Sequence, residues 1–131
     1  MREKFGQQFV LNPSSTNVVS PEEKFLNKLM GIIEEKMEDT EFDVNELVSE
    51  IGMSRTVLYK KVQALTNYSV ADLIKQIRLK KAEELFKTAT FSIAEVAYMV
   101  GFNDRKHFSK EFKKQYDFSP SEYIQNFHQK Q

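Results

Sequence analysis

The sequence predicts an all-α fold of about seven helices, in which one pair of short helices occurs twice. Residues 42–62 and 91–112 each contain an apolar stripe at helical spacing, a glycine, and a second apolar stripe. The first halves match when Phe42 is aligned with Phe91, and the second halves match when Leu58 is aligned with Phe108, because one residue is inserted after the glycine. We therefore predict two helix-turn-helix subdomains, joined by a long helix and preceded by an irregular linker.

Length and composition exclude several classes of protein. With 131 residues, the chain can form one domain or two small lobes that share a helix. It contains no cysteine, which excludes disulfides and thiolate metal sites. No apolar run approaches the ~20 residues of a membrane-spanning helix, and the N-terminus lacks the pattern of a signal peptide. We expect a cytoplasmic location.

The charges are balanced in total but unevenly distributed along the chain. Residues 1–53 contain 5 Lys/Arg and 11 Asp/Glu, whereas residues 54–131 contain 14 Lys/Arg and 8 Asp/Glu. A binding surface for a polyanion depends on the local field rather than on the net charge. The basic second part is therefore the candidate for such a surface.

Residues 1–20 are predicted to be an interdomain linker, because this stretch is polar, contains proline and has little helical periodicity. A loose segment in front of a small domain indicates a piece of a longer protein.

Residues 21–69 are predicted to hold an N-terminal helix and the first helix-turn-helix subdomain. Ser20 and Pro21 form a helix start, followed by glutamates that favour the positive end of the helix dipole. This first helix has one apolar stripe and an acidic outer face. We expect it to support the first repeat rather than to face a polyanion.

Each repeat carries its own helix-start and turn signals. Asp43 and Ser92 each precede a glutamate by three residues, which is the capping-box pattern. Gly52 and Gly101 follow the first helix of each copy, where a turn with positive φ is needed. The second helix then begins after a polar cap, which is Ser54 in the first copy and Asn103 or Asp104 in the second.

Residues 70–88 are predicted to be a connecting helix, because no glycine or proline interrupts their apolar stripe. Such a helix is roughly 28 Å long at ~1.5 Å per residue. This length is close to the ~34 Å of one turn of B-DNA. It could hold two reading helices on the same side of a duplex.

Residues 89–131 are predicted to hold the second helix-turn-helix subdomain and a short closing helix. Ser119 and Pro120 mark the start of that helix, and Tyr123 is expected to pack onto the second repeat.

The second helix of each repeat presents a polar outer face. In the first copy, Val57 is expected to be buried together with Leu58, Val62 and Leu65. The residues expected to bind DNA combine cations with hydroxyl and amide groups, which can pair with guanine, adenine or phosphates. They are Arg55, Thr56, Tyr59, Lys60 and Gln63 in the first copy, and Arg105, Lys106, Ser109, Lys110 and Lys113 in the second.

Other interpretations of these faces remain open. A basic stripe on one helix is usually just a solvated face, and Tyr59 could equally be a half-buried surface tyrosine. Duplication at equivalent positions favours DNA recognition. The alternatives are a helical protein-interaction module with little DNA affinity, and a domain in which only the second copy specifies bases. Arg78, in the connecting helix, is expected to be a structural brace or a phosphate contact.

No catalytic, cofactor or metal motif occurs in the sequence. The two histidines, His107 and His128, have no carboxylate or cysteine partners at metal-ligand spacing. No glycine-rich phosphate loop or nucleophile motif is present. We expect no enzymatic activity and no cofactor in this chain.

The second copy and its tail, IAEVAYMVGFNDRKHFSKEFKKQYDFSPSEY, resemble the DNA-binding domain of the AraC/XylS family of bacterial transcription regulators. The spacing of Gly101-Phe102, Phe108, Phe112, Phe118 and Pro120 carries the resemblance. It implies a transcription regulator whose two helix-turn-helix subdomains bind adjacent major-groove segments of double-stranded promoter DNA. Further candidate partners are RNA polymerase and a second copy of the chain, in a homodimer formed through the full-length protein.

The head of the chain, FVLNPSSTNVVSPEEKFLNKLMGIIEEKMED, resembles the join between a receiver domain and an AraC-type domain in hybrid two-component sensors. This resemblance implies a longer parent protein with a receiver domain, histidine kinase activity and an anchor in the inner membrane. The controlling signal would then be phosphorylation of the receiver. The chain departs from the family in its neutral net charge and its lack of tryptophan.

Overall fold

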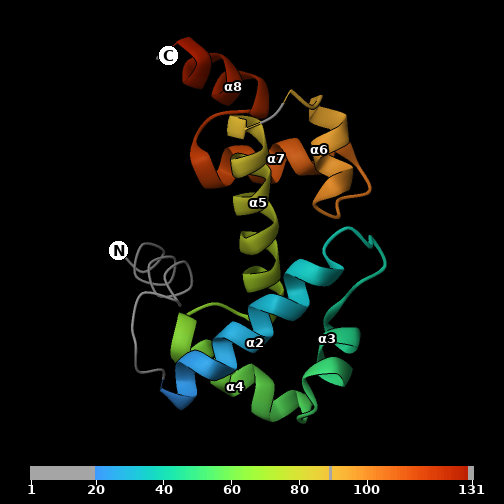
Figure 1. Cartoon of the computed structure of the whole chain (residues 1–131), viewed down its shortest axis with the longest axis vertical. Helices are drawn as coiled ribbons and strands as arrows, with labels where there is room; N and C mark the ends of the chain where they lie inside the picture. Colours follow the sequence, from blue (N-terminus) through green and yellow to red (C-terminus); the bar gives the residue numbers. More distant parts are fainter. Residues whose placement is uncertain (1–19, 89, 130–131) are drawn as a thin grey trace. The chain divides into compact units, whose positions relative to one another are not determined.

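A computed structural model describes residues 20–88 and 90–129 (Figure 1). The predicted linker over residues 1–20 therefore lies almost entirely outside the described residues. The described residues form seven α-helices and no strand, which confirms the predicted fold class. The helices are α2 (Pro21–Lys36), α3 (Val44–Ile51), α4 (Arg55–Thr66), α5 (Val70–Thr88), α6 (Ile93–Met99), α7 (Arg105–Tyr116) and α8 (Pro120–Gln129).

The helices fall into two compact units, and the boundary between them runs through α5 after Ile77. The described part of the first unit contains α2, α3, α4 and the first half of α5. The second unit contains the rest of α5, followed by α6, α7 and α8. It also includes Met37–Glu41, the segment that follows α2 in the chain. Each unit thus contains one helix-turn-helix pair.

Capping side chains lie at the helix starts that the sequence predicts. Ser20 and Glu23 cap α2 reciprocally, with the two backbone N–H groups donating over 3.0 and 3.1 Å. Ser92 and Glu95 form the same box at α6. At α3 the box is only half made, because Asp43 accepts from the backbone N–H of Glu46 but no reciprocal bond forms.

A glycine with positive φ follows the first helix of each pair. Gly52 has φ 77° and Gly101 has φ 95°, so both lie in a region that L side chains rarely adopt. Ser54 then caps α4 and Asp104 caps α7. Both turns are therefore determined locally, by a glycine and a capping side chain.

The duplication extends further than the helix-turn-helix pairs. The residues that cap the ends of α4 and α7, Asn67 and Asp117, have left-handed φ values of 68° and 69°. Two residues later, Ser69 and Ser119 each accept a hydrogen bond from the backbone N–H three residues on. The first half of α5 is therefore the counterpart of α8, and each repeat is a unit of three helices.

Aliphatic side chains form the core of the first unit. α2 packs against α3, and the fully buried aliphatic residues come from four helices. They are Leu29 and Ile33 of α2, Leu47 of α3, Leu58 and Val62 of α4, and Leu73 of α5.

Aromatic side chains fill the core of the second unit. Phe108 and Phe112 of α7 are fully buried. Phe86 of α5 contacts both rings, with centroid distances of 6.2 and 5.5 Å. Tyr123 of α8 meets Phe112 edge-on at 5.5 Å. This ring cluster fixes α7 between α5 and α8.

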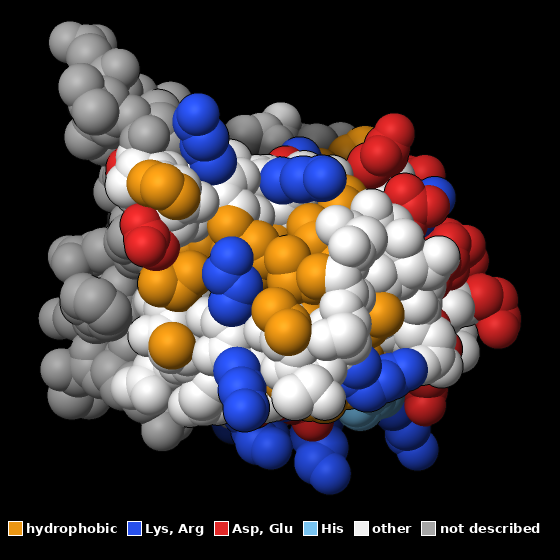
Figure 2. All heavy atoms as spheres, turned by 90° about the horizontal axis from the view of Figure 1, so that it is seen from below, with side chains coloured by type: hydrophobic (Ala, Val, Ile, Leu, Met, Phe, Trp, Pro, Cys, Tyr) orange, Lys and Arg blue, Asp and Glu red, His pale blue; other side chains and the backbone are white. Residues whose placement is uncertain are grey.

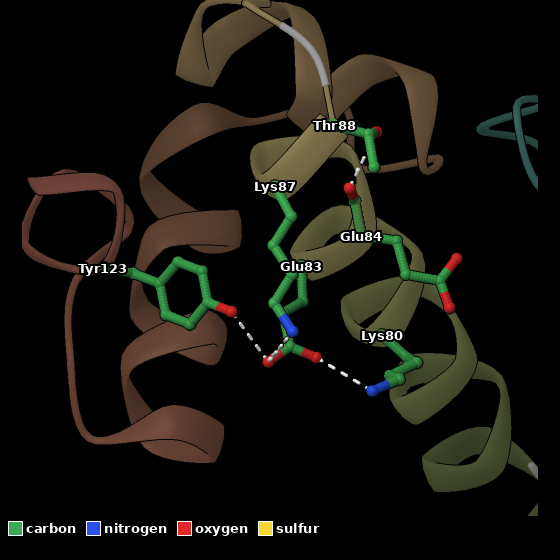
Figure 3. A network of polar contacts seen from close by, with 6 residues as sticks. All are labelled: Lys80, Glu83, Glu84, Lys87, Thr88 and Tyr123. Atoms are coloured by element: carbon green, nitrogen blue, oxygen red, sulfur yellow. Dashed lines mark hydrogen bonds and ion pairs between the residues drawn. The ribbon is translucent and has the colours of Figure 1, made fainter. Parts of the chain in front are cut away.

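A polar network joins α8 to α5 in the second unit (Figure 3). The Tyr123 hydroxyl donates to Glu83 over 2.9 Å, and Lys80 donates to the same carboxylate over 3.0 Å. Lys87 lies 3.8 Å from it. The Glu83 side chain is only 13% exposed, so these partners compensate for its desolvation.

One core prediction was wrong. Val57 was expected to be buried, but it is 47% exposed. Leu58 and Val62, one turn apart, take the inward positions of α4. Because neighbouring residues in a helix point about 100° apart, Val57 turns away from the core next to Leu58. Leu65 is only half-buried.

Candidate nucleic-acid interface

The predicted residues of α4 lie on its outer face. Ser54 starts the helix, and Leu58 and Val62 anchor its inner side. All five predicted residues are exposed: Arg55, Thr56, Tyr59, Lys60 and Gln63. Figure 2 views the molecule from below, where α4 lies in Figure 1, and shows Lys and Arg side chains among hydrophobic ones on that face.

Local contacts hold some of these α4 side chains. The Arg55 guanidinium donates to the Asn45 side chain of α3 and, over 3.1 Å, to the Tyr59 hydroxyl. Gln63 donates to Asn67 over 3.4 Å. These contacts reduce the freedom of Arg55 and fix the orientation of Tyr59.

Thr56 and Lys60 of α4 have no such local contacts with other described residues. Within the described residues, neither side chain makes a hydrogen bond or an ion pair, and both are exposed. Lys61, in contrast, places its ammonium group 4.6 Å from the centre of the Phe25 ring, on another side of the helix. Thr56 and Lys60 are thus available to a partner molecule without breaking a contact.

The predicted residues of α7 form a more strongly basic face. Arg105, Lys106, Lys110 and Lys113 are exposed, and Ser109 is half-buried. The side chains of Arg105, Lys106 and Lys110 have no ion-pair partner among residues 20–88 and 90–129. Lys113 lies 4.0 Å from Glu122, a separation at which an exposed pair contributes little. Arg105, Lys106 and Lys110 therefore carry positive charge that no other described group neutralises.

Two further side chains of α7 surround a buried carboxylate. Glu111 lies 3.7 Å from His107 and 4.0 Å from Lys114. The His107 ring also meets the Phe102 ring edge-on at 5.5 Å. His107 thus packs at the edge of the second unit, although its side chain is 58% exposed.

Arg78 braces the turn of the second helix pair. Its guanidinium lies against Gly101, beside the carbonyl of Met37. Two of its nitrogens, Nε and Nη2, are buried and find no hydrogen-bond partner in the described part of the chain. Burial lowers the pKa of Arg78, and the negative charge of Asp39 opposes that shift. This supports the expected brace rather than a phosphate contact.

The sequence pattern does not reveal which residues Arg78 braces. Met37, Arg78 and Gly101 are far apart in the chain, and none of the repeat signals connects them. A positive-φ glycine was predicted at position 101, but its contact with Arg78 depends on tertiary packing.

Comparison with known proteins identifies the family. A family model described as a helix-turn-helix domain matches residues 47–126, which is more than half of the chain. The chain belongs to the AraC-type helix-turn-helix family. The predicted resemblance to AraC/XylS-type domains is therefore confirmed, and this is a DNA-binding domain of the transcription-regulator class.

Three relatives of the AraC-type domain are informative. Histidine kinase P4 of Formosa agariphila is 37% identical over 94% of this chain. The C-terminal domain of the two-component response regulator yesN from Fusobacterium nucleatum is 30% identical, with a TM-score of 0.68, over 75% of this chain and 95% of that one. The DNA-binding domain of AdpA, solved with a target DNA, has a TM-score of 0.74 at 24% identity, over 80% of this chain and 94% of that one.

The AraC-type domain is short compared with its full-length relatives. It spans 9% of the histidine kinase and 34–37% of three transcription regulators that also match it. No three His, Asp or Glu side chains in the described ranges lie together as metal ligands would. No helix in those ranges is long and apolar enough to cross a membrane.

Proposed function

We propose that this chain is the output domain of a transcription regulator, and that α4 and α7 bind adjacent major-groove segments of one promoter site. The observation that carries the proposal is the pair of exposed, polar second helices at equivalent repeat positions, each held by a glycine turn and a capped start. In helix-turn-helix proteins the second helix enters the major groove and its first residues contact base edges.

Among the ten predicted residues, we assign some to base contacts and others to phosphate contacts. Arg105 is placed in the first turn of α7 and can make a paired contact to guanine. Lys110 and Lys113, further along the helix, suit phosphates. In α4, Lys60 suits a phosphate, and Gln63 can pair with adenine if it releases Asn67.

We further propose that phosphorylation of a receiver domain in the same parent protein controls this binding. The proposal is supported by the similarity to a histidine kinase over 94% of this chain and to the C-terminal domain of a response regulator. In the intact parent, phosphoryl transfer to the receiver should raise occupancy of the promoter site in a footprinting assay. Equal occupancy with and without phosphorylation contradicts this control.

Binding can be tested without knowing the operator. Duplexes that bind the chain are first selected from a random pool, and their affinity is then measured by fluorescence anisotropy across a salt series. We expect affinity to fall steeply with salt, with a log–log slope of about −0.9 per phosphate contact. The double variant Lys60→Ala, Lys110→Ala should bind weakly and show a shallower slope.

The same assay separates DNA recognition from the alternative of a protein-interaction module. If no sequence is enriched and no duplex binds at low salt, the proposed function is wrong. If the double variant binds the selected duplex as tightly as the unmodified chain, the assignment of these two faces is wrong. Circular dichroism should show the same helix content for both proteins.

A further inference from the structure

Val57 occupies a position on α4 that the fold itself does not explain. It lies in the first turn of the helix, where its backbone N–H bonds the capping Ser54 side chain, and its own side chain is 47% exposed. Valine is not a favoured helix former because its branched side chain is restricted there. A largely exposed valine at this position therefore adds little core packing and does not favour the helix.

The neighbours of Val57 make this part of α4 a small apolar surface within a polar face. Thr56 precedes it and carries a methyl group, and Lys60 lies one turn further along the same side. Neither has a partner within residues 20–88 and 90–129. The nearest guanidinium, on Arg55, is already bonded to Asn45 and Tyr59. The first turn of α4 thus offers methyl groups and few free donors.

The equivalent turn of α7 has the opposite character. His107 takes the place of Val57 and Lys106 takes the place of Thr56. Arg105 corresponds to Arg55, but its guanidinium has no partner in the described part of the chain. The first turn of α7 therefore offers hydrogen-bond donors where the first turn of α4 offers methyl groups.

The major groove distinguishes base pairs by these two kinds of chemistry. Thymine exposes a C5 methyl group, whereas guanine exposes two acceptors, N7 and O6. Apolar side chains near the start of a recognition helix discriminate thymine, and free cations there discriminate guanine. A single exposed apolar residue often has no role, but Val57 stands in the turn that contacts bases.

We propose that Val57 determines specificity by contacting the C5 methyl group of a thymine in the segment bound by α4, while α7 selects guanine. The inference rests on the proposed function, because it assumes that α4 enters the major groove. It predicts two half-sites of different chemistry, with a required thymine in only one of them.

Replacing single thymines of the selected duplex by 2′-deoxyuridine removes only the methyl group and tests the inference directly. We expect one such replacement to weaken binding about three- to fivefold, which corresponds to the loss of one buried methyl contact. The Val57→Ala variant should bind the unmodified duplex more weakly by a similar factor, and should no longer distinguish uracil from thymine at that position.

His107→Ala is the matched control, since it changes the equivalent position of the other recognition helix. It should retain the full preference for thymine at the base that Val57 contacts. If every deoxyuridine duplex binds like the parent duplex, or if Val57→Ala keeps the preference, the inference is wrong while the proposed function stands. If the unmodified chain selects no duplex at all, the proposed function itself fails.

Discussion

The guanidinium of Arg78 lies against the backbone of Gly101, so closely that a Cβ atom on Gly101 would stand 2.8 Å from Arg78 Cζ. The same Cβ would also collide with the backbone carbonyl of Met37. Gly52, the equivalent glycine of the first repeat, has nothing within 4 Å of the corresponding point. The two turns share a backbone conformation but have different surroundings.

Gly101→Ala should therefore destabilise the chain more than Gly52→Ala. Both changes place alanine at positive φ, which costs about 1–2 kcal/mol. Only Gly101→Ala adds a collision with buried backbone, which typically costs a further ~1–3 kcal/mol. Urea unfolding measures both values. Equal losses of unfolding free energy in the two variants would show that Arg78 and Met37 do not constrain the second turn.

Tyr123→Phe should weaken the attachment of α8 to α5 in the second unit. The change removes the donor to Glu83, a mostly buried carboxylate, and should lower the free energy of unfolding by about 1–2 kcal/mol at neutral pH. Tyr98→Phe is the control, because Tyr98 is 57% exposed and should tolerate the loss of its hydroxyl. A similar effect of both variants contradicts the role given to the Glu83 network.

Tyr123 should also make stability sensitive to alkaline pH. Burial raises its pKa above the ordinary value of 10.0, and the hydrogen bond to Glu83 and the charge of Glu83 add to the shift. Because the folded state keeps this proton more tightly than the unfolded state, stability is complete below pH 10 and falls as pH rises above it. Tyr123→Phe should show a smaller alkaline loss in thermal unfolding curves. An unchanged pH profile would exclude Tyr123 as the cause.

Arg105→Ala should relax sequence discrimination, whereas Lys114→Ala should not. Arg105 lies in the first turn of α7 without an ion-pair partner among the described residues, so its loss should cost about 1–3 kcal/mol on the preferred sequence and less on others. Lys114 lies 4.0 Å from Glu111, outside the ten predicted residues, and we propose that it contacts a phosphate rather than a base. Its loss should weaken all duplexes alike and reduce the salt slope by about one. Anisotropy on preferred and scrambled duplexes compares them, and identical discrimination in both variants contradicts the assignment.

Glu95→Ala should cost more stability than Glu46→Ala, although both glutamates occupy the same repeat position. Glu95 accepts from the backbone N–H of Ser92 over 2.8 Å and closes the capping box. Glu46 instead lies 3.8 Å from Lys36 in a partly exposed pair. We expect about 1 kcal/mol for Glu95→Ala and under about 0.5 kcal/mol for Glu46→Ala. The reverse order in urea unfolding would show that the half-made box at α3 is the more important one.

Local signals made most of the fold predictable. Helix starts at Ser20, Ser54 and Ser92 follow from side chains that bond their own backbone, and the glycine turns follow from a backbone conformation that other residues avoid. These interactions extend over three or four residues, so the sequence pattern contains them completely. The sequence repeat also identified α4 and α7 as equivalent helices of the two copies.

Predictions that depended on distant neighbours were less complete. Val57 was placed in the core because apolar character at helical spacing suggests burial, but the inward direction of α4 depends on which residues the rest of the unit covers. Glu46 does not close its expected capping box, and its carboxylate instead lies 3.8 Å from Lys36 of another helix. The brace of Arg78 against Gly101 joins residues with no local relationship. Local hydrogen bonding therefore determined the helices and turns, whereas packing between distant segments decided which side chains were left free to bind.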